Sequence, residues 1–254
     1  MSPILTRRRL IGSAALGAGG LLAGCDRLGE NEGFRKILFA ADEMNRHAQR
    51  LLTDRDALAR EFTAENLSPV FRGNGTQYPA GPDYQAHAAA GFASWRLAVN
   101  GLVLRPASFS MAQIRSMPRR SQITRHDCVE GWSAIGKWTG VPLKRILDHV
   151  VLSDRARYLV FHCADDSGGG VTYYESIDLI DAFHPQTILA WALNNAALPI
   201  RNGAPLRLRV ERHLGYKHAK YVRRIEAVAS LSGIGAGKGG FWEDRAGYEW
   251  YAGI

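Results

Sequence analysis

The stretch of residues 125–140 constrains the chain more than any other, because it holds one cysteine, two tryptophans and three glycines within sixteen residues. A thiolate is the softest ligand available, so a metal held by Cys128 alone would be a thiophilic transition metal whose other ligands come from elsewhere. No second cysteine follows at C-x2-C spacing, which argues against a structural zinc site. The alternative for an isolated cysteine is a buried, inert thiol in a small core.

Composition sets broad limits on the protein. A chain of 254 residues with 46% hydrophobic residues can bury one substantial core or two small ones. The net charge of +8 suits an anionic cofactor or substrate as well as any basic surface. The arginines are scattered, and no helix-turn-helix or zinc pattern accompanies them, so we expect no nucleic-acid partner. Three cysteines do not make a disulfide framework.

The amino terminus has the composition of an export signal. Three consecutive arginines precede a mildly apolar stretch rich in glycine and alanine, which predicts a signal peptide at residues 1–24 and resembles a twin-arginine signal. The segment Leu22-Ala23-Gly24-Cys25 resembles a bacterial lipobox, in which Cys25 is lipidated and anchors the protein to the membrane. An ordinary cleavage site with an incidental cysteine is the alternative. We expect residues 25–66 to form a helical and linker segment and residues 67–254 to form one domain.

Apolar periodicity predicts several regular elements. Helical spacing indicates one or two helices within residues 33–65 and a proline-started helix at 142–151. The expected strands are 95–103, 157–163 and 222–231. The Asn100-Gly101 pair indicates a hairpin turn. We expect Asp165 and Asp166 to lie in a solvated turn, because neighbouring side chains in extended chain point opposite ways.

Three motifs together resemble one protein family. The run C-V-E-G-W-S begins at Cys128, and W-x-G-V-P-L follows ten residues on. Residues 201–208 read R-N-G-A-P-L-R-L, and residues 215–220 read G-Y-K-H-A-K. These segments resemble the molybdopterin-dependent oxidoreductases of the sulfite-oxidase family, in particular their bacterial periplasmic branch, which includes methionine-sulfoxide reductases. The resemblance covers roughly residues 67–250.

The resemblance implies a fold, a cofactor and a set of site residues. The fold class is α+β, with mixed sheets and flanking helices, a short helix at 110–117 and a strand that leads to Cys128. The cofactor is molybdenum-molybdopterin, with Cys128 as the protein ligand of the metal and with Tyr173 and Arg72 near the substrate. The residues implied to bind the cofactor are Asn74, Cys163, Asn202, Arg207, His218, Ala219 and Lys220.

The chemistry of these residue types fits such a cofactor. An amide such as Asn202 offers both donors and acceptors to a pterin edge, and the guanidinium of Arg207 can bind a phosphate through two parallel hydrogen bonds. Cys163 stands where related proteins commonly have threonine, so a buried structural thiol and a disulfide with Cys128 are alternatives to a cofactor contact.

The function implied is an extracytoplasmic oxidoreductase that transfers an oxygen atom and two electrons at molybdenum. Sulfite oxidases of animals and plants carry arginines four and five residues after the ligand cysteine, where this chain has Trp132 and Ser133. A pocket without these cations should bind a dianion poorly. We therefore expect reduction of a small S- or N-oxide, with electrons from a membrane haem b subunit or a cytochrome c. Sulfite oxidation, or a non-catalytic lipid-anchored binding protein on the same fold, are the alternatives.

Overall fold

The computed structural model of the protein describes residues 31, 33, 44–166 and 170–254. The chain divides into two compact units, Met1–Leu52 and Thr53–Ile254. In the first unit, residues 44–52 form a helix. The predicted signal peptide and Cys25 lie outside the described residues. Within the described ranges, none of the helices has the length and apolar character needed to cross a membrane.

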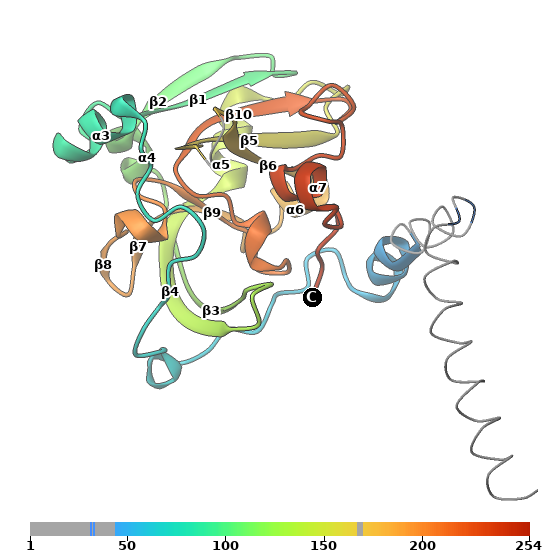
Figure 1. The fold of residues 1–254 in the computed structure, drawn as a ribbon, viewed down its shortest axis with the longest axis horizontal. Coiled ribbons are helices and arrows are strands. Elements are labelled where there is room, and N and C mark those ends of the chain that lie inside the picture. The colour runs from blue at the N-terminus through green and yellow to red at the C-terminus, as the bar shows by residue number, and fades with distance from the viewer. Residues whose placement is uncertain (1–30, 32, 34–43, 167–169) are drawn as a thin grey trace, which may run out of the picture. The chain divides into compact units, whose positions relative to one another are not determined.

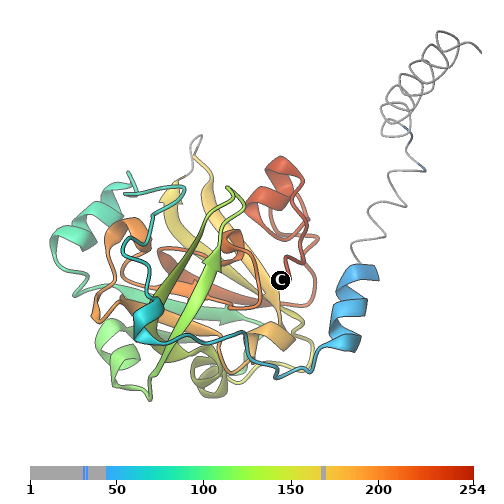
Figure 2. The ribbon, with the colours of Figure 1, turned by 90° about the horizontal axis from the view of Figure 1, so that it is seen from below.

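The second unit, as far as it is described, is built around two five-stranded sheets (Figures 1 and 2). The first sheet has the strand order β2 (Ala107–Ser110), β1 (Arg96–Gly101), β10 (Val222–Val228), β5 (Tyr158–Asp166) and β6 (Thr172–Asp178). The second has the order β3 (Arg120–Asp127), β4 (Ser133–Pro142), β7 (Ile188–Leu193) and β8 (Ala196–Ala197), with β9 (Arg207–Arg209) also paired to β7. The prediction of an α+β fold with mixed sheets is therefore confirmed.

Short helices connect and cover these sheets. The α-helices of this unit are α3 (Pro82–Ala89), α4 (Met111–Ser116), α5 (Leu143–Val150), α6 (Leu179–Ala182) and α7 (Phe241–Ala246), and the 3-10 helices are η1 (Ala64–Asn66), η2 (Ile200–Asn202) and η3 (Gly215–Lys217). Helix α4 begins with a capping box, because Ser110 Oγ accepts from the Gln113 amide at 3.2 Å while Gln113 Oε1 accepts from the Ser110 amide at 2.8 Å. Helix α5 follows Pro142 and buries its apolar face in the main core.

The first sheet joins distant parts of the chain. Strand β10 lies at its centre and pairs in parallel with β1, and β1 also pairs antiparallel with β2. The Asn100-Gly101 pair was expected to form the hairpin turn between β1 and β2, but it lies inside β1. Gly101 has φ +82°, and a Cβ atom at this position would collide with the carbonyl oxygen of Ala227. Glycine is required here by close approach to β10 and not by a turn.

The β3–β4 hairpin positions the cysteine. The two strands pair in register from Arg120 opposite Gly140 to Asp127 opposite Ser133. At the tip, the Cys128 amide donates to the Trp132 carbonyl at 2.9 Å, and Gly131 takes φ +84°. Cys128 therefore follows directly from the end of β3, as expected. Figure 1 shows the β3–β4 hairpin on the side of the second unit away from β1 and β2.

The segment before residue 67 is more extended than predicted. The helix ends at residue 52, although helical structure was expected as far as residue 65. The Phe62 amide donates to the Ile123 carbonyl of β3 at 2.8 Å, and Ala59 exchanges hydrogen bonds with the side chain of Gln186 at 2.8 and 3.0 Å. These contacts need an extended backbone, so tertiary pairing overrides the local helical pattern.

Candidate active site

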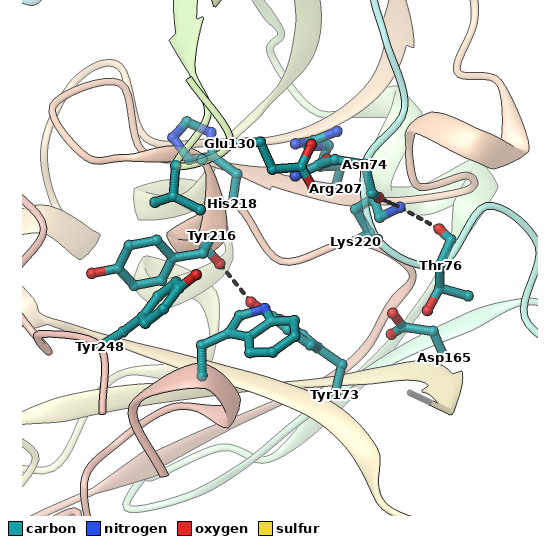
Figure 3. A pocket seen from close by; sticks show the side chains of 14 residues that line it. Asn74, Thr76, Glu130, Asp165, Tyr173, Arg207, Tyr216, His218, Lys220 and Tyr248 are labelled. Carbon is teal, nitrogen blue, oxygen red and sulfur yellow. Dashed lines mark hydrogen bonds between the residues drawn. The ribbon is translucent and has the colours of Figure 1, made fainter. Parts of the chain in front are cut away.

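A cavity of about 190 Å³ lies where β5, β6, β9 and η3 meet the loops around residues 74–76 and 128–131 (Figure 3). One part of its lining is polar and consists of Asn74, Thr76, Asp165, Arg207, His218 and Lys220. Another part is aromatic and consists of Tyr173, Tyr216, Trp242 and Tyr248. Figure 3 shows Tyr216 and Tyr248 on one side of the cavity, with Thr76, Lys220 and Asp165 on the other.

Cys128 lies next to residues that line this cavity. Its two following residues, Val129 and Glu130, line the cavity, and its Sγ accepts from Asn74 Nδ2 at 3.5 Å. The side chain is 6% exposed, and this burial raises the pKa of the Cys128 thiol. The sequence motif and the predicted cofactor contact Asn74 are thus brought together by the tip of the β3–β4 hairpin.

Arg207 lies in β9 with its guanidinium directed at the polar part of the cavity. It is 1% exposed, its Nη1 donates to the Asn202 carbonyl at 3.0 Å, and its guanidinium carbon lies 5.3 Å from the centre of the Trp138 ring. Burial and the neighbouring Arg209 lower the pKa of Arg207 to about 9. A buried cation without a carboxylate partner in contact is costly, so this arrangement is suited to an anion that enters the cavity.

Lys220 and His218 complete the basic part of the lining. Lys220 Nζ donates to the carbonyl oxygens of Asn74 at 2.7 Å, of Thr76, and of Arg201 at 3.3 Å, so it holds the 74–76 loop against the domain. Burial, followed by Arg207, lowers the pKa of Lys220 to about 7. Burial also lowers the pKa of His218 well below its ordinary value, so its imidazole is neutral.

Comparison with known proteins decides the family. Residues 84–232 match the family described as oxidoreductase molybdopterin binding domain. The chain belongs to this family. It is therefore an oxidoreductase with a molybdopterin-binding domain, and the family, fold class and enzyme class predicted from the sequence are confirmed.

The names of several similar proteins describe reactions of sulfur compounds. The chain is 38% identical over 241 residues to the putative protein-methionine-sulfoxide reductase subunit YedZ1 of Azospira oryzae, covering 95% of this chain and 85% of that protein. It is 35% identical over 147 residues to the protein-methionine-sulfoxide reductase catalytic subunit MsrP of Xanthomonas campestris, covering 54% of this chain and 46% of that protein. The sulfane dehydrogenase SoxCD of Paracoccus pantotrophus shares the fold, with a TM-score of 0.51 and 24% identity over 54% of this chain and 39% of that chain.

The residues of the cavity fit a molybdopterin. Among the described residues, four buried polar atoms around the polar part have no hydrogen-bond partner, namely Asn202 Oδ1, Arg207 Nε, His218 Nδ1 and Asp165 Oδ1. Buried polar groups are normally paired, so unpaired ones that gather in one place indicate a missing partner. A pterin edge and a phosphate together offer the matching donors and acceptors.

Five of the predicted site residues, one of them Cys128, are not among the residues that line the cavity. Arg72 has an exposed side chain, and its carbonyl accepts from Asn202 Nδ2 at 3.3 Å. Asn202 supports a lining residue, because its carbonyl accepts from Arg207 Nη1 at 3.0 Å. Ala219 is buried, with its carbonyl accepting from the Leu208 amide at 2.8 Å. Cys163 is buried in β5 with its Sγ 3.8 Å from the Phe161 carbonyl oxygen, and it and Cys128 are both free thiols, so the alternative of a disulfide between them is wrong.

The prediction made for Asp165 is wrong. This residue was expected in a solvated turn, but it lies in β5, is 3% exposed and lines the cavity. Burial raises the pKa of its carboxyl group to about 6, although Lys220 opposes the shift. The strand predicted from the sequence ends at Cys163, and only a prediction that extended it further would have placed Asp165 in β5.

Two aromatic residues of the cavity also escaped the sequence analysis. Trp242 lies on α7, and Tyr248 follows this helix. By contrast, Tyr173 was expected at the substrate side and does line the cavity, with its hydroxyl donating to the Tyr216 carbonyl at 2.7 Å. No local pattern marks Trp242 or Tyr248, because the folding of the C-terminal segment against β6 places them here.

Proposed function

We propose that this oxidoreductase reduces a sulfoxide to a thioether at a molybdenum-molybdopterin cofactor whose metal is held by the Cys128 thiolate. The observation that carries the proposal is the position of Cys128 Sγ beside Asn74, next to a cavity whose buried polar atoms lack partners. The names of the relatives, which are methionine-sulfoxide reductase subunits, support an S-oxide as the substrate.

The polar part of the cavity would hold the cofactor. Arg207 would bind a phosphate, and His218 Nδ1 would accept a hydrogen bond from the cofactor, as would the Asp165 carboxylate. Asn202 would support Arg207, and Lys220, which itself lines the cavity, would fix the 74–76 loop. When bound, the molybdenum cofactor supplies the two electrons and takes up the oxygen atom, so that sulfoxide, two electrons and two protons give thioether and water.

A neutral substrate fits the charges near Cys128. Arg125, three residues before Cys128, has an exposed side chain that is paired with Asp127 at 2.9 Å, and the side chain of Arg72 is exposed as well. Glu130 lines the cavity close to Cys128 and accepts from Trp132 Nε1 at 3.0 Å. A carboxylate at this place repels sulfite and leaves a neutral oxide unaffected.

Tyr173 is the residue we assign to orient the oxygen of the substrate. Burial raises the pKa of its hydroxyl well above the ordinary value, so the group remains protonated and can donate a hydrogen bond to the substrate oxygen. Its present acceptor is the carbonyl of Tyr216, another residue of the cavity lining, at 2.7 Å.

The electron donor and the location follow as parts of the proposal. Relatives described as reductase subunits or catalytic subunits support a partner, for which we propose a membrane haem b subunit or a cytochrome c. The arginine run and Leu22-Ala23-Gly24-Cys25 support export through the twin-arginine pathway to the periplasm and attachment to the membrane by a lipid.

The test compares two buried cysteines. Protein from a host that makes molybdopterin is assayed for molybdenum content and for turnover of sulfoxides with a reduced viologen dye, and of sulfite with a one-electron acceptor. Cys128→Ser should lose both metal and sulfoxide turnover, because a hard alkoxide replaces a soft thiolate, whereas Cys163→Ser should keep both. Equal molybdenum and turnover in Cys128→Ser would refute the assignment. Turnover of sulfite alone, or of neither substrate by loaded protein, would refute sulfoxide reduction.

A further inference from the structure

Three residues of the aromatic part of the cavity form a continuous surface. We call this surface the aromatic wall and define it as Tyr216, Trp242 and Tyr248. The rings of Trp242 and Tyr248 stack with centroids 5.9 Å apart and an interplanar angle of 26°. Tyr248 in turn meets Tyr216 edge to face at 5.1 Å. Trp242 is 38% exposed, so the aromatic wall runs from inside the cavity to the protein surface.

The aromatic wall is held rigidly from behind. Lys217, next to Tyr216, binds two buried carboxylates, Glu175 of β6 at 2.5 Å and Glu243 of α7 at 2.8 Å. These ion pairs tie the 3-10 helix η3 and helix α7 to the first sheet. The Tyr216 hydroxyl donates to the Glu249 carbonyl, directly after Tyr248, at 2.6 Å.

A second set of contacts fixes the start of α7. Asp244 accepts from the amides of Ala236 and Lys238 at 2.8 and 2.9 Å, and from the hydroxyl of Tyr174. The turn so formed needs Gly235, where a Cβ atom would collide with the Tyr174 hydroxyl and the Asp244 carboxylate. The aromatic wall is thus organised before any ligand arrives, which lowers the entropic cost of binding to it.

The aromatic wall differs from the rest of the cavity in chemistry and in origin. The polar part contains the unpaired buried atoms that fit the cofactor, whereas the wall offers ring faces and edges. Trp242 and Tyr248 also lie beyond residues 84–232, which match the molybdopterin-binding family. Aromatic rings bind flat apolar groups and make favourable contacts with sulfur.

We propose that the aromatic wall selects the substrate by binding the apolar group attached to the sulfoxide, so that a sulfoxide with a flat aromatic substituent is preferred over a small one. Trp242 is the specificity-determining residue at the entrance, facing the cavity together with Val129, which is also partly exposed. The inference rests on the proposed function and adds the class of substituent that this cavity takes.

The experiment compares methyl phenyl sulfoxide with dimethyl sulfoxide in the molybdenum-loaded enzyme. Both have the same reacting bond, and only the first presents a ring to the aromatic wall. In Trp242→Ala, the ratio of their kcat/KM values should fall about tenfold through a higher KM for the phenyl substrate. Trp242→Phe should restore most of the ratio, and Leu104→Ala, an exposed residue far from the cavity lining, should leave it unchanged.

A binding measurement keeps the inference separate from the proposed function. Methyl phenyl sulfone, which carries the same substituent, is titrated calorimetrically into the oxidised enzyme, and Trp242→Ala should bind it about tenfold more weakly. If no sulfoxide is reduced by any variant, the proposed function fails. The titration still shows whether the aromatic wall binds the aromatic substituent. An unchanged ratio and an unchanged sulfone affinity in Trp242→Ala would overturn the inference, as would loss of molybdopterin from this variant, since the wall would then contact the cofactor.

Discussion

Asp165 shows what a single charge in the cavity does to the protein. Its carboxylate is buried, and its Oδ1 has no hydrogen-bond partner among the described residues. The folded state therefore favours the protonated form, and the pKa rises from 3.8 to about 6. The stabilising effect of that shift is fully present below the unfolded pKa and is lost as pH rises through the folded pKa.

The cofactor-free protein should lose up to about 3 kcal/mol of stability from Asp165 between pH 4 and pH 7.5. Asp165→Asn should remove this pH dependence. The free energy of unfolding of the variant should therefore exceed that of the wild type at pH 7.5 but not at pH 4. Urea unfolding of cofactor-free protein at both pH values measures the difference. Asp154→Asn, an exposed carboxylate outside the cavity lining, serves as the control. A gain for Asp165→Asn that is the same at both pH values would contradict the prediction.

Tyr173→Phe removes one hydroxyl and leaves the ring in place. If this hydroxyl donates to the substrate oxygen, turnover should fall on the order of 100-fold while KM and molybdenum content change little. Steady-state kinetics on loaded protein provide the measurement. Tyr158→Phe, a half-buried tyrosine of β5 that packs on Trp250 and does not line the cavity, is the matched control. Turnover within twofold of wild type would remove Tyr173 from the reaction.

At the scale of secondary structure, the sequence correctly predicts the helices and strands that are determined by their own residues. Helix α5 follows from its apolar spacing after Pro142, and β5 and β10 follow from their apolar runs. Two predictions failed where tertiary contacts decide. Residues 57–62 pair with β3 and Gln186 instead of continuing a helix, and Gly101 stands at a close approach of two strands instead of in a turn.

An experiment can distinguish a glycine that is needed only for its positive φ from one that is also needed for the close approach of two strands. Gly91 and Gly101 both have positive φ, at +60° and +82°, but a Cβ atom at Gly91 would meet nothing within 4 Å. Gly91→Ala should cost about 1 kcal/mol of unfolding free energy for the left-handed conformation alone. Gly101→Ala should cost more than about 3 kcal/mol, because β1 and β10 must also move apart. Similar losses for the two variants in chemical unfolding would show that close approach is unimportant.

The site residues that could be predicted from the sequence are those that belong to short, contiguous motifs. Cys128, Asn74, Arg207, His218 and Lys220 were all expected from short segments, and the fold brings them to one cavity or next to residues that line it. The aromatic wall and Asp165 were not expected, because their role depends on how α7 and the end of β5 pack. A motif identifies residues that bind a shared cofactor, whereas the walls that face a substrate come from the packing of later elements.

At the scale of the whole molecule, the export proposal makes a prediction about residues outside the described ranges. Arg8→Lys combined with Arg9→Lys should hold the precursor in the cytoplasm, because this proposal takes the paired arginines as the export signal. Cys25→Ala should release a soluble form into the periplasm, because the proposed lipid attachment site is lost. Cell fractionation with an antibody to the protein checks both. Cys25→Ala found in the membrane fraction would exclude lipid anchoring.

The central position of β10 has a consequence for the timing of biosynthesis. The first sheet cannot close until Val222–Val228 has left the ribosome, since β1 and β5 meet each other only through this strand. The cavity likewise takes side chains from Asn74 to Tyr248. Contacts between such distant positions form slowly and late. Cofactor loading must therefore be a post-translational event, completed on a nearly full-length chain.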